Sequence, residues 1–78
     1  MPTVLRVKGY RFFFFSLEGQ EPTHIHVEAA ENLAKFWLEP ISLAKSHGFR
    51  SGELTEIQRI IEANLDLFLE RWHEHFGN

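Results

Sequence analysis

Apolar and polar side chains alternate along most of the first half of the chain. The clearest case is the segment in which Ile25 and Val27 separate His24, His26 and Glu28. A period of two is typical of a strand with one buried face, because successive side chains point to opposite sides of the sheet. The predicted strands are residues 4–7, 10–16, 24–29, 33–38 and 41–46, of which the last also fits a helical turn.

The hydrophobic period changes to three and four residues in the last third of the chain. Ser51 suits the N-cap of a helix, and Gly77 suits its end. Glu53 and Glu56 suit the positive end of the helix dipole. We therefore expect one long helix over residues 52–76. Its core-facing stripe comprises Leu54, Ile57, Ile61, Leu65, Phe68, Leu69, Trp72 and Phe76.

These elements predict an α+β fold in a single domain that spans residues 1–78. We expect an antiparallel meander of four or five strands, with the long C-terminal helix packed across one face. A chain of 78 residues is short for more than one domain. Because a domain of this size buries little surface, a metal ion or a partner subunit often supports it.

The second predicted strand is apolar on both faces. The aromatic residues at positions 10, 12 and 14 point to one face of the strand, and Phe13 and Phe15 point to the other. One helix can cover only one of these two faces. The other face needs short segments of the chain or a second copy of the protein. We favour a homodimer, because exposed aromatic surface is costly for a small domain. The candidate interface residues are Tyr10, Phe13, Phe15, Ile60 and Leu67, the last two because they lie off the helix stripe.

His24, His26 and Glu28 fall on one face of the third predicted strand. Alternate residues of a strand lie roughly 6.5–7 Å apart, so two imidazoles at this spacing can chelate one metal ion. A His–His–carboxylate set suits zinc, or iron where coordination positions stay open. The ordinary alternative is that each histidine forms hydrogen bonds to neighbouring groups on the sheet. We carry both alternatives, with zinc or another divalent metal as the candidate cofactor.

The same two histidines, His24 and His26, suit a small hydrolase that acts on RNA. Either one would be the general base or acid, and Arg11 or Lys35 would steady the phosphate. The charge argues against this, because eight basic and eleven acidic side chains give a net charge of −3. Nucleic-acid affinity comes largely from basic residues, so we expect no nucleic-acid partner. Pro2 is a second catalytic candidate, since removal of the initiating methionine would expose its amine, but an edge strand also favours proline there.

The composition excludes several classes of protein. The absence of cysteine excludes disulfides and thiolate zinc sites. No apolar run approaches the roughly 20 residues that cross a bilayer, and the N-terminus lacks the pattern of a signal peptide. We therefore expect a soluble cytoplasmic protein with no membrane partner.

Motifs spread over nearly the whole chain carry a family resemblance. They are residues 1–4, 9–14, 21–27 and 34–38, together with Trp72. The proline followed by His-x-His and the Ala-Lys-Phe-Trp-Leu strand are the most specific of them. Together they resemble the bacterial family called domain of unknown function 4160.

The resemblance implies a small prokaryotic accessory protein in the cytoplasm. Members of that family often lie beside a second small protein, in an arrangement that resembles a toxin–antitoxin pair. The resemblance assigns no activity, and it gives no role to His24 and His26. We therefore expect a self-associating interaction protein with a second small protein as a further partner. A metal-binding protein or a small hydrolase is the alternative.

Overall fold

The computed structural model describes residues 3–15 and 19–77. Five strands are followed by two helices, so the α+β class and the strand at 41–46 are confirmed. Pro2 and residue 16, the last of the predicted strand 10–16, lie outside the described part of the chain. The elements are β1 (Thr3–Val7), β2 (Tyr10–Phe13), β3 (His24–Ala29), β4 (Asn32–Leu38), β5 (Ile41–His47), α1 (Ser51–Ala63) and α2 (Leu65–Phe76).

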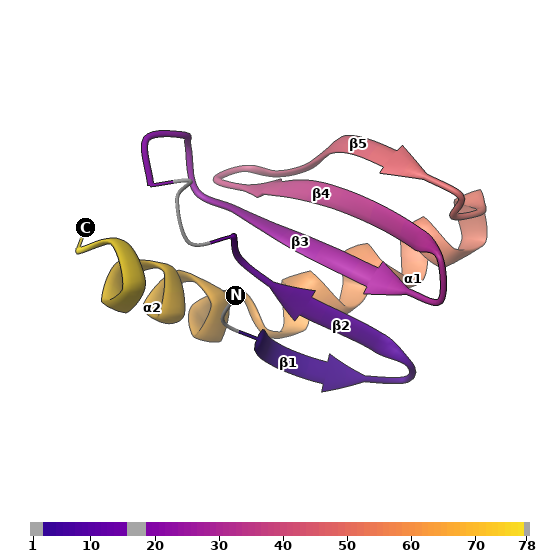
Figure 1. Ribbon diagram of the computed structural model, residues 1–78, viewed down its shortest axis with the longest axis horizontal. Helices are drawn as coiled ribbons and strands as arrows, with labels where there is room; N and C mark the ends of the chain where they lie inside the picture. Colours follow the sequence, from indigo (N-terminus) through magenta and orange to yellow (C-terminus); the bar gives the residue numbers. More distant parts are fainter. Residues whose placement is uncertain (1–2, 16–18, 78) are drawn as a thin grey trace.

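The strands form one antiparallel sheet in the order in which they occur along the chain, β1-β2-β3-β4-β5 (Figure 1). The β1–β2, β3–β4 and β4–β5 connections are two-residue turns. In the first of these, Lys8 and Gly9 both take positive φ, at 53° and 83°. The two-residue hairpin turns whose twist matches that of the strands require positive φ at such positions. The predicted meander is confirmed.

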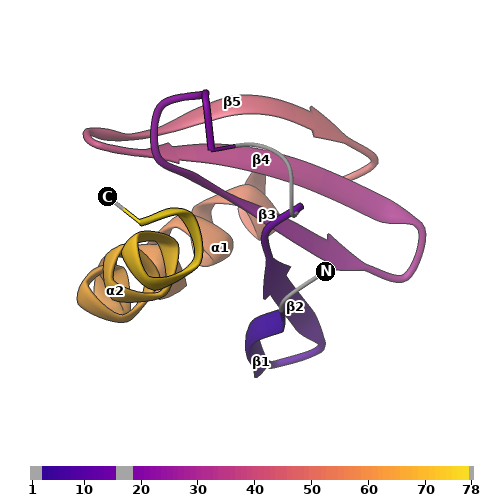
Figure 2. The same cartoon turned by 60° about the vertical axis from the view of Figure 1, so that its left-hand side comes forward.

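Both helices lie on the same face of the sheet, which gives the molecule two layers (Figures 1 and 2). The side chains that alternation assigns to the inner face are buried between the layers. Phe12, Ile25, Val27 and Phe36 are each at most 1 % exposed. The helices contribute the other half of this core through Ile57, Ile61, Phe68 and Trp72. These four residues belong to the stripe predicted from the helical period.

The helical region is interrupted at Asn64, so the prediction of one long helix over residues 52–76 is wrong. Asn64 has φ −122° and ψ 21°, away from helical values. Its side-chain Nδ2 donates a hydrogen bond to the Ile60 carbonyl at 2.8 Å, in competition with the backbone ladder. The ladder resumes where the Phe68 N–H donates to the Asn64 carbonyl at 3.1 Å. No helix within residues 3–15 and 19–77 is long and apolar enough to cross a membrane.

The two ends of the helical region lie close to the predicted positions. α1 begins at Ser51, but the N-cap residue is Arg50 and not Ser51. The Arg50 backbone N–H donates a hydrogen bond to Glu53 Oε1 at 2.9 Å, so a first-turn glutamate supplies the capping contact. At the other end, Gly77 has a φ of 76°, and its N–H donates to the His73 carbonyl at 2.8 Å. The predicted glycine stop is therefore confirmed.

Tyr10 joins the sheet to α1. Its side chain is 6 % exposed, and its hydroxyl donates a hydrogen bond to Glu56 Oε1 at 2.8 Å. Burial, this hydrogen bond and the charges of Glu56 and Glu53 raise the pKa of Tyr10 from 10.0 to about 12. Because the folded pKa exceeds the unfolded one, the associated stability is fully present below pH 10.0 and is lost as the pH rises through about 12.

We expect an alkaline titration to show this shift directly, because Tyr10 is the only tyrosine in the chain. Phenolate absorbance should appear near pH 12 in the folded protein and near pH 10.0 in urea. Glu56→Gln keeps a hydrogen-bond acceptor but removes the charge, so it should lower the folded midpoint. A folded midpoint equal to that in urea would contradict the contact between Tyr10 and Glu56.

The face of β2 that points away from the helices is covered by side chains of the same chain. Phe13 is only 1 % exposed. The Arg11 guanidinium lies 4.4 Å from its ring centre, and the ring centres of Phe15 and His26 lie 5.2 and 5.5 Å from it. The two-sided aromatic strand therefore leaves less apolar surface in solvent than its sequence suggests.

Candidate functional site

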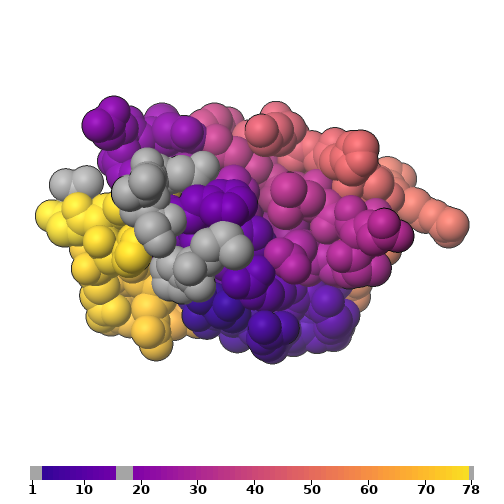
Figure 3. Space-filling model, in the orientation of Figure 1, coloured from indigo at the N-terminus to yellow at the C-terminus, as the bar shows by residue number. Residues whose placement is uncertain are grey.

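The sheet face opposite the helices carries parallel rows of side chains that run from strand to strand. Cross-strand neighbours on one face have Cβ atoms about 4.5–5.5 Å apart, so these rows form a continuous surface, which we call the outer face. Figure 3 views the molecule from this side. One row is Phe13, His26, Lys35 and Lys45, and the next is Arg11, Glu28, Leu33 and His47.

The outer face differs in charge from the helices. Its two rows hold Arg11, Lys35 and Lys45 against the single acid Glu28, with two histidines among them. Residues 51–76 hold six acidic side chains and two arginines. With Glu21, which pairs with Lys35 at the hollow, the outer face holds three cations and two carboxylates, so it lacks the excess of acid found on the helices.

His24 is a packed structural residue. Its side chain is fully buried, and its Nδ1 lies 2.8 Å from the Pro22 carbonyl oxygen. Its ring centre lies 4.9 Å from that of Trp72 on α2 and 5.8 Å from that of Trp37 on β4. Glu21 Oε1 lies 3.9 Å from the same Nδ1. These contacts tie the start of β3 to both neighbouring elements.

His26 and Glu28 also contact neighbouring side chains. His26 is 5 % exposed, stacks on Phe13 and meets the edge of the Phe15 ring at 4.6 Å between centres. Glu28 Oε1 accepts a hydrogen bond from Arg11 Nη1 at 2.9 Å. In the part of the chain that the structure describes, no three His, Cys, Asp or Glu side chains are placed to hold a metal ion. Metal binding by the predicted set of His24, His26 and Glu28 stays a prediction.

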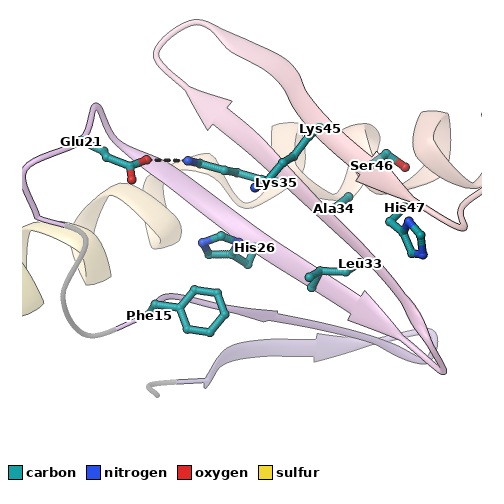
Figure 4. A pocket seen from close by; sticks show the side chains of 9 residues that line it. All are labelled: Phe15, Glu21, His26, Leu33, Ala34, Lys35, Lys45, Ser46 and His47. Atoms are coloured by element: carbon teal, nitrogen blue, oxygen red, sulfur yellow. Dashed lines mark hydrogen bonds and ion pairs between the residues drawn. The ribbon is translucent and has the colours of Figure 1, made fainter.

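A hollow of about 510 Å³ opens on the outer face above β3, β4 and β5 (Figure 4). Lys35 pairs with Glu21 on one wall, and its Nζ lies 4.6 Å from the centre of the Trp37 ring. The Lys35 side chain is 12 % exposed, so its charge is held in one place. The lining residues are Phe15, Glu21, His26, Leu33, Ala34, Lys35, Lys45, Ser46 and His47.

Lys45 stands directly opposite Lys35 in the pairing of β4 with β5. It is exposed, and none of the ion pairs among residues 3–15 and 19–77 involves it. Like charges at opposite positions of a sheet destabilise it by a few tenths to about 1 kcal/mol. Glu21 already pairs with Lys35, so Lys45 is the ammonium group that would stabilise a further anion in the hollow.

The five predicted interface residues are placed differently in the fold. Tyr10 and Phe13 are buried by their own chain. Ile60 and Leu67 are partly buried and pack against the core. Phe15 is 36 % exposed and lies at the rim of the hollow, so it is the most exposed of the five. Self-association stays a prediction.

Sequence reasoning did not single out Lys45, Ser46 or His47. Alternation along β5 could have placed Lys45 and His47 on one face. Their partners on β4 could not be counted from the turn, because the register shifts between Lys35 and Phe36. The opposition of the two lysines is therefore visible only in the folded sheet.

Comparison with known proteins places the chain in a family. No curated protein and no solved structure matches it. Residues 9–73 match the family described as Domain of unknown function (DUF4160). The match runs from the β1–β2 turn into α2 and so covers most of the sheet and the helices. The resemblance found in the motifs is thereby confirmed, and the chain belongs to this family of domains of unknown function.

Proposed function

We propose that the protein is a binding module whose outer face holds the anionic part of a partner in the hollow above β3, β4 and β5. One observation carries the proposal: Lys45 faces Lys35 across the sheet, and the described residues offer it no carboxylate. An anion in the hollow would interact directly with the Lys45 ammonium group and would share the Lys35 ammonium group with Glu21. His47 lines the same hollow and would add a hydrogen-bond donor.

The two lysines differ in a way that suits binding. The Trp37 ring and Glu21 hold Lys35 in place, so its charge is already positioned before a ligand arrives. A preorganised group loses little side-chain entropy on binding. Leu33 and Phe15, which are 40 % and 36 % exposed, supply apolar contact beside these charges. The surface can therefore bind a group that combines negative charge with an apolar part.

The positions of the histidines favour binding over hydrolysis. A general base must approach to about 2.6–3.2 Å of the proton that it removes. His24 is fully buried, and His26 is 5 % exposed beneath aromatic rings. His24 does not line the hollow, and His26 lines it with only a small part of its side chain exposed. This supports a binding role over the hydrolase alternative.

The partner that we infer is a second small protein. A long polyanion such as RNA would meet only three cations on the two rows of the outer face and would be repelled by the acidic helices. A folded partner that offers one or two carboxylates needs only the local positive charge. Pairing of the toxin–antitoxin kind, which the family resemblance implies, would be one form of this interaction.

Titration with inorganic pyrophosphate at low salt, followed by amide NMR shifts, tests the anion site. We expect shifts to concentrate on β4 and β5 around Lys35 and Lys45. Lys45→Glu should weaken the binding about tenfold or more, because it replaces an attraction with a repulsion. The matched control is Arg59→Glu, which makes the same change of charge on an exposed position of α1. Equal weakening by both variants would show that the anion responds only to net charge, and the proposed site would be wrong.

A further inference from the structure

The strand β5 forms an open edge of the sheet next to the hollow. It is the last strand in the order β1-β2-β3-β4-β5, and it lies along the upper edge in Figure 1. Five of its seven residues are exposed. Along such an edge, every second residue directs its backbone N–H and C=O away from the sheet, where they can pair with another strand. In β5 the extra residue Ala44 interrupts this alternation between Leu43 and Lys45, so an added strand has to follow the same shift of register.

The two sides of β5 have different chemistry. Lys45 and His47 pair with Lys35 and Leu33 and therefore lie on the outer face. Leu43 pairs with the core residue Phe36 and lies on the helix side, where it is 44 % exposed. A strand added beside β5 would thus meet positive charge on one of its faces and apolar surface on the other.

We propose that β5 accepts an extended segment of a partner protein in which acidic and apolar residues alternate. The segment adds to the sheet as a sixth strand. Its carboxylates lie beside Lys45 and His47 at the hollow, and its apolar side chains cover Leu43 on the helix side. Backbone hydrogen bonds supply affinity in this mode, and the alternate side chains supply specificity. The inference rests on the anion site described above and names the partner of that site.

Charge distinguishes this partner from a second copy of the chain. Lys45 is the only charged residue among the seven of β5 if histidine is neutral, so a second β5 strand brings no carboxylate. Two-fold pairing of β5 with itself about a centre close to Lys45 would place two Lys45 side chains near one another. A lysine on an edge strand is a usual means of preventing such self-pairing. An acidic segment would be attracted to Lys45, whereas a second β5 strand would be repelled by it. We therefore infer that the edge binds an acidic segment and not a second copy of the chain.

The probe is a capped, labelled heptapeptide that alternates glutamate and valine, and binding is followed by fluorescence anisotropy. We expect the peptide to bind the wild-type protein, and Lys45→Glu to weaken it about tenfold or more. The control Arg59→Glu should bind the peptide almost as well as the wild type. A lysine–valine peptide should bind Lys45→Glu better than it binds the wild type. Tighter binding of the lysine–valine peptide by Lys45→Glu would show that the variant is folded and that position 45 faces the peptide.

N-methylation of the peptide backbone distinguishes strand addition from simple attraction. One peptide carries methyl groups on all glutamate amides, and a second carries them on all valine amides. Only one of these sets points toward β5 in an added strand, so only one peptide should lose binding. Equal binding of both methylated peptides and the parent would overturn strand addition and leave the anion site intact.

Three other outcomes would also overturn the inference. Tighter binding of oligouridylate than of the peptide, with loss in Lys45→Glu, would assign the face to nucleic acid and keep the anion site. Failure of both the peptide and pyrophosphate to bind would remove the strand addition and the proposed function together. A dimer in sedimentation experiments that protects β5 amides from exchange in the absence of peptide would assign the edge to a second copy.

Discussion

Replacing Trp72 with alanine is expected to leave much of the protein unfolded at room temperature. Trp72 is 2 % exposed, and its ring centre lies 4.2 Å from that of Phe76, 4.9 Å from His24 and 5.4 Å from Phe14. Truncation of a buried tryptophan to alanine costs about 3–5 kcal/mol. A small domain has roughly 5 kcal/mol of stability, so little would remain. Urea unfolding followed by far-ultraviolet circular dichroism measures the loss.

Trp37→Ala is the matched control for this prediction. Trp37 lies on the opposite side of the sheet and is only partly buried, with the Lys35 ammonium 4.6 Å from its ring centre. Its truncation leaves no cavity between the layers, so we expect a cost of about 1–2 kcal/mol. Trp72→Phe should retain more stability than Trp72→Ala. Equal losses in Trp37→Ala and Trp72→Ala would contradict the packing of α2 against the sheet through Trp72.

The substitution Gly48→Ala is expected to cost about 2–4 kcal/mol although it adds a single methyl group. Gly48 has a φ of 94°, a backbone conformation that strains any L-residue with a side chain. A Cβ atom there would also lie 2.1 Å from Asn32 Oδ1 and 2.9 Å from its Cγ. Asn32 is the first residue of β4, and its side chain has to move from its present position to relieve this overlap. Thermal or urea unfolding gives the difference in free energy.

Gly9→Ala separates backbone strain from overlap. Gly9 has a similar φ of 83°, but a Cβ atom at this position would have no neighbour within 4 Å. We expect this variant to lose only the strain energy, about 1–2 kcal/mol. Adding Asn32→Ala to Gly48→Ala removes the overlapping atoms and should recover part of the loss. If Gly9→Ala and Gly48→Ala cost the same, the close contact of Gly48 with Asn32 is wrong.

The sequence was most informative where burial repeats with a regular period. The alternation around Ile25 and Val27 predicted the inner face of β3, and both residues are fully buried. This works because a strand face is either in the core or in solvent, and the residue types differ accordingly. The break in the helix shows the limit of this approach. Asn64 is one polar residue in a strong amphipathic pattern, and its hydrogen bond to Ile60 interrupts the helix without changing that pattern.

The candidate site was predictable only in part. The pattern of alternation predicted that His24 and His26 share one sheet face, and their ring centres lie 5.1 Å apart. Their role as metal ligands stays a prediction. The alternation could not show that Phe13, Phe15 and Trp72 would cover them, because those residues reach the histidines from β2, from the segment after it and from α2. Because segments distant in the sequence bury His24 and His26, these two side chains are part of the packed structure.

The sequence by itself determined the class of fold, the order of the elements, the residues of the core and the family. These properties depend on local periods and motifs, which are written along the chain. Only the tertiary structure decided which charges face each other. The position of Lys45 opposite Lys35 depends on a register shift between β4 and β5, and the segregation of charge depends on both helices packing on one face. Pairing between strands is a property of the folded sheet, so the binding surface became visible only there.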